Sequence, residues 1–173
     1  MARVTGPVTD WVREIAAADR RLGADARAAE AETKRRKEQF ASAAMEMVTR
    51  LRSLFEAAAT AFNASSPAQP VAVTRLKGAG FAVSRGNRKL AVVKSADWNV
   101  VFSFTDPPKT DLFAVLSRLE RDGVGWHLYR KADDKDKFEV VPDEPGDLAE
   151  RIVRQLFVRL VQTSGPRAYR IRR

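Results

Sequence analysis

The sequence contains no cysteine and a single histidine. Without cysteine, disulfide frameworks, thiolate zinc sites, iron–sulfur clusters and cysteine nucleophiles are all excluded. One histidine excludes multi-histidine metal motifs such as HExxH and leaves one candidate base for a serine–histidine pair. That residue, His127, lies between Trp126 and Leu128 in an alternating segment. The alternation favours an exposed strand position over a catalytic role for His127.

Long apolar runs are also missing. The charged residues Asp10, Arg13 and Glu14 interrupt the first apolar stretch, which therefore lacks the core of a signal peptide. No segment approaches the ~18 uncharged apolar residues that a membrane-spanning helix requires. We therefore expect a soluble, cytoplasmic protein without a membrane span.

The glycine-rich and acidic segments match no ligand-binding motif. Residues 77–80 (KGAG) have neither the GxxxxGK[ST] nor the GxGxxG spacing, and the pattern predicts that a strand follows them. Residues 133–136 (DDKD) lack the glycine and the final glutamate of an EF-hand. We interpret both segments as turns. With no catalytic motif, we expect a protein that is not an enzyme and uses no cofactor and no metal, although chemistry by dispersed polar residues stays open.

Positive charge is in excess and unevenly distributed. The formal net charge is +9, and the surplus lies in residues 66–110 and 146–173, each of which has seven basic and two acidic residues. Such an uneven surplus indicates either a positive face that attracts nucleic acid, anionic lipid or an acidic protein, or simply a contribution to solubility.

A long helix is predicted near the N-terminus. No proline lies between Pro7 and Pro67, and alanine, glutamate and arginine recur throughout. We expect the helix to begin at Thr9 or Asp10 and to end near Phe62, before a linker at 63–70. About 54 residues would make a helix of roughly 80 Å. Gly23 is the expected position of any break, because glycine is unfavourable inside a helix.

The predicted helix has three differently patterned parts. Its first part carries a short apolar stripe, formed by Val8, Trp11, Val12, Ile15 and Leu22. The middle part, 24–39, has no apolar residue larger than alanine. Residues 40–62 place apolar residues at i, i+3, i+4 and i+7 spacing, which predicts that this part packs on a core.

After the linker, the hydrophobic period changes to two. Alternation predicts four antiparallel strands, at about 71–77, 80–85, 89–95 and 98–104, with glycine or asparagine at the turns between them. Phe102 is expected on the buried face. A helix is then predicted from Thr110 or Asp111 to about Leu119, followed by two strands near 124–128 and 138–140 and a last helix from Asp147 to about Gln162.

The predicted fold is α+β, with a long N-terminal helix and an antiparallel sheet that has helices packed on one face, in the order α-ββββ-α-ββ-α. Residues 1–65 form the helix, whose C-terminal half packs on the domain. Residues 66–164 form that domain, and 165–173 form a basic tail.

Two functions are compatible with these features. The first is a non-catalytic adaptor or assembly protein that contacts itself or a partner through the apolar stripe. A heptad continued from Ile15 and Leu22 meets Ala29 and Arg36, so helix pairing at the ends is favoured over a continuous coiled coil. The alternative is a nucleic-acid-binding accessory factor, which would use basic and aromatic residues of one hairpin and the tail. Those residues are Arg85, Arg88, Lys89, Arg167, Tyr169, Arg170, Arg172 and Arg173.

Overall fold

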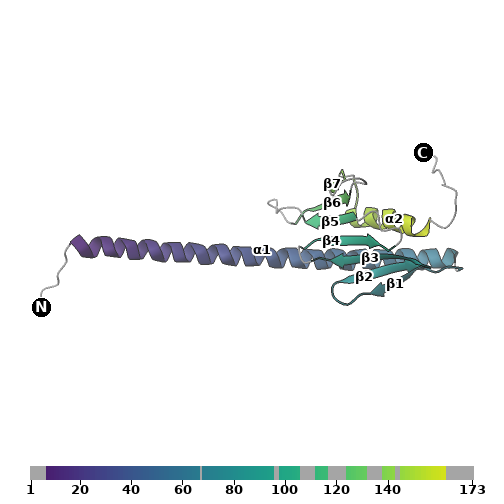
Figure 1. The fold of residues 1–173 in the computed structure, drawn as a ribbon, viewed down its shortest axis with the longest axis horizontal. Helices are drawn as coiled ribbons and strands as arrows, with labels where there is room; N and C mark the ends of the chain where they lie inside the picture. Colours follow the sequence, from purple (N-terminus) through teal and green to yellow (C-terminus); the bar gives the residue numbers. More distant parts are fainter. Residues whose placement is uncertain are drawn as a thin grey trace. The chain divides into compact units, whose positions relative to one another are not determined.

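A computed structural model describes residues 7–66, 68–95, 98–105, 112–116, 124–131, 138–142 and 145–162. The fold is α+β, as predicted: a long N-terminal helix precedes an antiparallel sheet, and a second helix follows the sheet (Figure 1). The chain divides into two compact units, Met1–Gln39 and Phe40–Arg173. The sheet and the second helix belong to the second unit.

The first helix, α1, runs without interruption from Pro7 to Ser65. Proline is well placed at its start, because the first helical N–H needs no intrahelical partner. Gly23 does not break the helix. At the other end, the side-chain amide of Asn63 donates to the carbonyl of Val71 (2.9 Å) and accepts from its N–H (2.7 Å), so the chain is held where α1 gives way to the sheet.

Seven strands form one sheet, each paired antiparallel with the next along the chain. They are β1 (Ala72–Arg75), β2 (Gly80–Arg85), β3 (Arg88–Lys94), β4 (Val100–Phe104), β5 (Leu112–Leu116), β6 (Trp126–Lys131) and β7 (Phe138–Val140). The first four strands confirm the predicted meander. Arg85 pairs with Arg88 across a two-residue turn, in which Gly86 adopts φ +55°, as tight hairpins require.

The helix expected over residues 111–119 is wrong where the structure describes it. Leu112–Leu116 form β5, which pairs with β4 on one side and β6 on the other. A short apolar run is compatible with either a helix or a buried strand. Here the two neighbouring strands provide the hydrogen-bond partners for its backbone N–H and C=O groups. This pairing joins the predicted meander and the predicted hairpin into one sheet. Thr110, Asp111 and the tail 165–173 lie outside the described residues.

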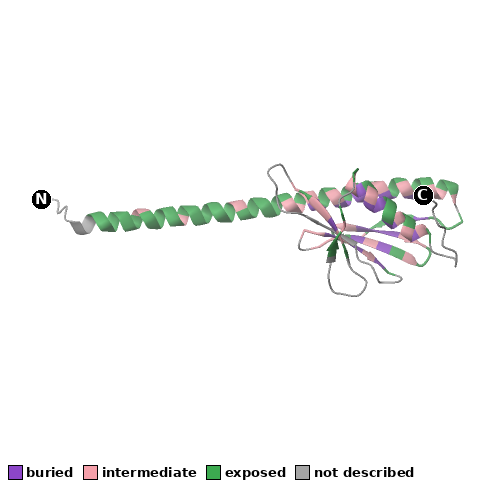
Figure 2. Cartoon of the chain, turned by 90° about the horizontal axis from the view of Figure 1, so that it is seen from above, coloured by how far each residue is buried: buried purple, intermediate pink, exposed green. Residues whose placement is uncertain are grey.

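The core lies on one face of the sheet. Cross-strand register aligns Phe81, Val92 and Phe102, all fully buried, as predicted for Phe102. The second half of α1 and the C-terminal helix α2 (Leu148–Val161) cover this face. In Figure 2 the buried residues, in purple, lie in the second unit. Phe55 of α1 contacts Phe81 of β2, with ring centroids 5.7 Å apart, and Phe157 of α2, with ring centroids 6.4 Å apart. The two helices and the sheet therefore share one core.

The start of α2 is fixed by a capping residue. Asp147 accepts a hydrogen bond from the N–H of Glu150 (3.0 Å), which satisfies one of the free N–H groups at the helix start. Its other carboxylate oxygen pairs with the guanidinium of Arg50 on α1. The same side chain thus ends the loop before α2 and links α2 to α1.

Candidate protein-binding surfaces

The helix of the first unit carries exposed apolar side chains. Trp11, Ile15 and Leu22 are 52%, 59% and 68% exposed, and Val12 beside them is 47% exposed. Spacings of four and seven residues place Trp11, Ile15 and Leu22 on one helix face. Residues 10–39 are almost entirely exposed (Figure 2). Four of the five residues predicted to bind a partner are therefore accessible, and the side chain of the fifth, Val8, lies outside the described part of the chain.

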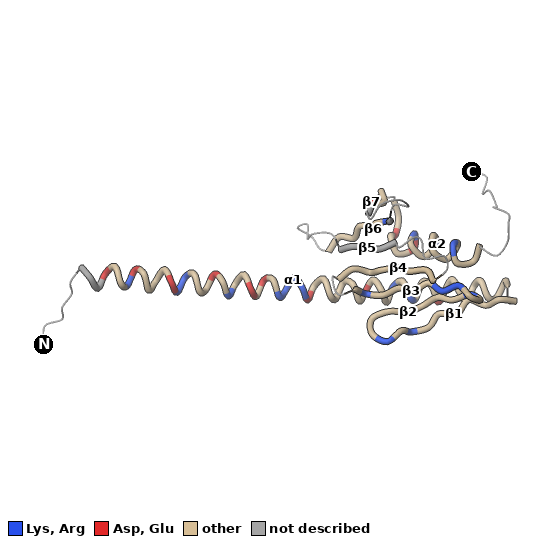
Figure 3. The backbone as a smooth tube through the Cα atoms, viewed as in Figure 1, with Lys and Arg blue, Asp and Glu red and all other residues tan. Residues whose placement is uncertain are grey.

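Ion pairs join charged residues within the helix of the first unit, from Arg13 with Asp10 to Lys34 with Glu38. Basic and acidic residues are interspersed along the first unit (Figure 3). Arg35 and Arg36 each donate to Glu32, at 3.0 Å. The hydrogen bonds from Arg35 and Arg36 lower the pKa of Glu32, and the bond to Glu32 raises the pKa of Arg35. Oppositely charged residues three or four apart favour helix formation without tertiary contacts. The pairs of Glu32 with Arg35 and Arg36 therefore contribute to the stability of the polar middle part of the helix.

The basic hairpin tip between β2 and β3 is attached to the end of α2. The guanidinium of Arg85 donates to the carbonyl of Val161 and lies 5.0 Å from the centre of the Phe62 ring. Arg88 donates to the carbonyl of Arg159 (3.4 Å). Cations are favourable at a helix C-terminus, where the last carbonyls lack intrahelical partners. Arg85 and Arg88 therefore have a structural role, which the sequence analysis missed.

The other residues of the nucleic-acid hypothesis are placed differently. Lys89 is exposed on β3, whereas Arg167, Tyr169, Arg170, Arg172 and Arg173 lie outside the described residues. Whether these residues bind nucleic acid stays a prediction. His127 lies in β6, as expected, on the face opposite Leu128, and it is partly exposed.

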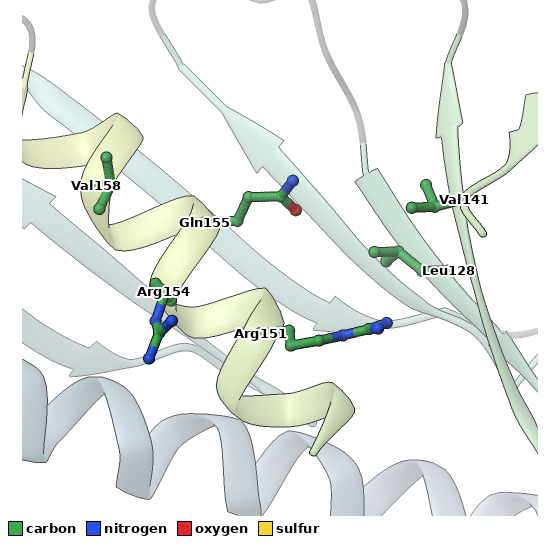
Figure 4. A pocket seen from close by; sticks show the side chains of 6 residues that line it. All are labelled: Leu128, Val141, Arg151, Arg154, Gln155 and Val158. Atoms are coloured by element: carbon green, nitrogen blue, oxygen red, sulfur yellow. The ribbon is translucent and has the colours of Figure 1, made fainter. Parts of the chain in front are cut away.

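A hollow of about 300 Å³ lies between α2 and the last strands. Its lining residues come from three segments: Leu128 of β6, Val141 after β7, and Arg151, Arg154, Gln155 and Val158 of α2. Figure 4 shows Arg151 and Gln155 extending from α2 toward the strands, whereas Arg154 extends from another side of the helix. Sequence analysis missed the hollow, since its residues are far apart in the chain and form no motif.

A second hollow, of about 350 Å³, adjoins the first. It is lined by Arg130, Glu139, Val140, Val141, Pro142 and Gln155, and therefore shares Val141 and Gln155 with the first hollow. We call the two together the α2–β7 groove.

In the described part of the chain, no three histidine, cysteine or acidic residues lie close enough together to hold a metal ion. Neither of the described helices is both long and apolar enough to cross a membrane. The fold and these surfaces define an α+β protein with a long helical N-terminal unit. Comparison with protein-family models, with curated proteins and with solved structures yields no match.

Proposed function

We propose that the protein is a non-catalytic adaptor that makes protein–protein contacts through the helix of its first unit, with Trp11, Ile15 and Leu22 at the centre of the contact. The exposed apolar face of that helix is the observation that supports this proposal. Single exposed apolar residues are common on protein surfaces, but a cluster that includes tryptophan is typical of a binding site.

The energetics favour burial of this face against another chain. A large apolar side chain gains about 1.5–3 kcal/mol when it is fully removed from water. Association opposes this gain with a loss of translational and rotational freedom of ~4 kcal/mol or more. The small residues Ala18 and Ala26, on the same face as the stripe, let a partner helix approach closely. Pairing of two helices along this face, with either a second copy or a different protein, can therefore exceed the entropic cost.

The proposal is tested by removing the apolar stripe without shortening the chain. The double variant Trp11→Ser, Ile15→Ser is compared with wild type and with Met45→Ser, which removes another exposed apolar side chain (43% exposed) from the same helix within the second unit. Circular dichroism checks that helix content is retained. Sedimentation velocity then reports the assembly state, and affinity capture followed by mass spectrometry reports bound partners.

We expect the double variant to lose self-association or partner capture and Met45→Ser to retain it. Equal assembly and equal capture by the double variant and wild type would contradict the adaptor proposal.

A further inference from the structure

A third hollow, of about 150 Å³, lies between α1 and the turn that joins β1 to β2. We call it the α1–β1 hollow, and all of its lining residues belong to the second unit. Pockets for drug-sized ligands measure roughly 300–1,000 Å³, so this hollow suits only a small chemical group. Val48 and Phe81, which are both buried, form its inner wall. An apolar wall strengthens a hydrogen bond or an ion pair that is made against it.

The charge of the hollow is positive. Arg52 of α1 and Arg75 of β1 line it, and none of its described lining residues is acidic. Arg75 is exposed, and within the described residues it makes no hydrogen bond, ion pair or ring contact. The N–H donors of the Arg75 guanidinium are therefore free to bind a ligand.

Arg52 contributes a donor that lacks a partner. Its Nε is shut off from water and makes no hydrogen bond in the described part of the chain. The carboxylate of Glu56, one turn along α1, forms an ion pair with this nitrogen at 3.5 Å, and the Glu56 side chain is 53% exposed, so water screens its charge. A buried donor without a hydrogen bond is costly, and an anion beside Arg52 can accept from it.

The turn before β2 adds backbone donors. Gly78 and Ala79 line the hollow, and their N–H groups make no backbone hydrogen bond to any described residue. Gly78 adopts φ +88°, a conformation that favours glycine. Free N–H groups of a turn are common anion ligands. The spacing of residues 77–80 is not that of a phosphate loop, and here the positive charge comes from two arginines outside the turn.

We infer that the α1–β1 hollow binds one phosphate group, either as inorganic phosphate or as the phosphate of a small monoester. The planar guanidinium of Arg75 pairs with two phosphate oxygens. The Nε of Arg52 and the N–H groups of the turn donate to the others. These donors come from three separate segments, so a tetrahedral anion with oxygens in several directions matches them better than a planar carboxylate does. The site lies in the second unit, and it can fail or hold independently of the adaptor function of the first.

The binding test is a ¹H–¹⁵N NMR titration of the full chain at about pH 7, where a phosphate monoester is largely a dianion. One arm adds inorganic phosphate, a second adds glycerol phosphate, and sodium chloride at equal ionic strength is the reference. We expect saturable shifts of the Arg52 Nε–H and of the Gly78 and Ala79 amides, with a Kd of about 0.1–1 mM. Saturation by glycerol phosphate assigns the hollow to esters, and saturation by inorganic phosphate alone assigns it to the free ion.

Two results of the titration contradict the inference. The first is that neither phosphate ligand saturates these signals by about 10 mM. The second is that sodium chloride shifts them equally, because the signals then respond only to ionic strength.

Substitution of Arg75 locates the site. Arg75 is exposed and has no partner among the described residues, so it tolerates replacement. Arg75→Gln should weaken phosphate binding about tenfold, because it removes charge-assisted hydrogen bonds. Arg154→Gln makes the same charge change at another exposed arginine, outside the hollow, and should leave the affinity nearly unchanged.

Substitution of Glu56 should act in the opposite direction. Glu56→Gln removes the carboxylate that competes with phosphate for Arg52, so binding should tighten about threefold. Tightening cannot result from misfolding. Glu30→Gln makes the same charge change at an exposed glutamate of the first unit and should have no effect.

The controls separate the hollow both from net charge and from the adaptor proposal. If each variant and its control change the affinity equally, phosphate responds only to the net charge of the protein, and the hollow is not its site. The double variant Trp11→Ser, Ile15→Ser should bind phosphate as wild type does, whether or not it loses assembly. A loss of assembly therefore leaves the phosphate site standing, and a failure to bind phosphate leaves the adaptor proposal standing.

Discussion

Replacement of Phe102 by alanine tests the assignment of the buried face of the sheet. Phe102 lies in β4, pairs with Val92 of β3 and Leu112 of β5, and is 0% exposed. It belongs to the core that the sheet shares with α1 and α2. The substitution removes a whole aromatic ring from a position that strands and helices enclose.

The expected loss is large because two effects add. The variant loses the free energy that the buried ring gains when it is transferred out of water. In addition, the surrounding strands and helices relax only partly into the cavity that the ring leaves. For fully buried phenylalanine these effects together cost about 3–5 kcal/mol. With a urea m value of about 2 kcal/mol per molar, the unfolding midpoint should fall by about 2 M.

Urea denaturation followed by circular dichroism measures this change. Val101→Ala is the matched control, since Val101 directly precedes Phe102 in β4, points to the opposite face and is partly exposed. We expect Val101→Ala to cost about 1 kcal/mol or less. If Phe102→Ala lowers the free energy of unfolding by less than about 1 kcal/mol, or if Val101→Ala lowers it by more than Phe102→Ala does, the assigned face and register are wrong.

Substitutions of two glycines and of the basic hairpin residues test other parts of the structure. Gly23→Ala should raise helix content and stabilise α1 by roughly 0.5–1 kcal/mol, because the added methyl group meets no atom within 4 Å; circular dichroism measures it, and a loss of helix would mean that α1 breaks there. Gly80→Ala should destabilise the sheet by about 1–3 kcal/mol in urea, since the new Cβ would lie 2.7 Å from a carbonyl oxygen of β3. Arg85→Gln with Arg88→Gln should lower the melting temperature by loss of the contacts with the end of α2, whereas Lys89→Gln should not. If the hairpin also binds nucleic acid, replacing Arg85, Arg88 and Lys89 together with glutamine should weaken binding to many sequences alike and flatten its salt dependence in gel shifts. No binding by wild type at ~50 mM salt would remove that hypothesis.

Local pattern was sufficient for most of the fold. Period-two alternation and turn glycines located β1 to β4 within about two residues, and the apolar spacing of 148–161 located α2. The absence of proline predicted a long α1, although whether Gly23 interrupts it could not be decided, because one glycine costs only ~1 kcal/mol in a helix.

Features that depend on distant partners could not be predicted. The run Leu112–Leu116 reads equally well as a helix, and only the strands on both sides of it make it β5. For the same reason the capping roles of Arg85 and Arg88 were missed, since the end of α2 lies more than 70 residues away in sequence. The exposed stripe of Trp11 and Ile15 was predictable because one helix contains all of it, whereas the α2–β7 groove is assembled from separate elements.

A chain that lacks residues 1–23 tests most directly whether the first unit is an interaction element. Sedimentation velocity and thermal unfolding are measured for this chain and for the full chain side by side. The truncation removes Trp11, Ile15 and Leu22 and leaves every buried core residue in place. The adaptor account predicts that the truncated chain loses the assembly state or bound partner of the full chain while its melting temperature stays nearly unchanged. An unchanged assembly state together with a marked fall in melting temperature would contradict it, because the removed helix would then stabilise its own fold.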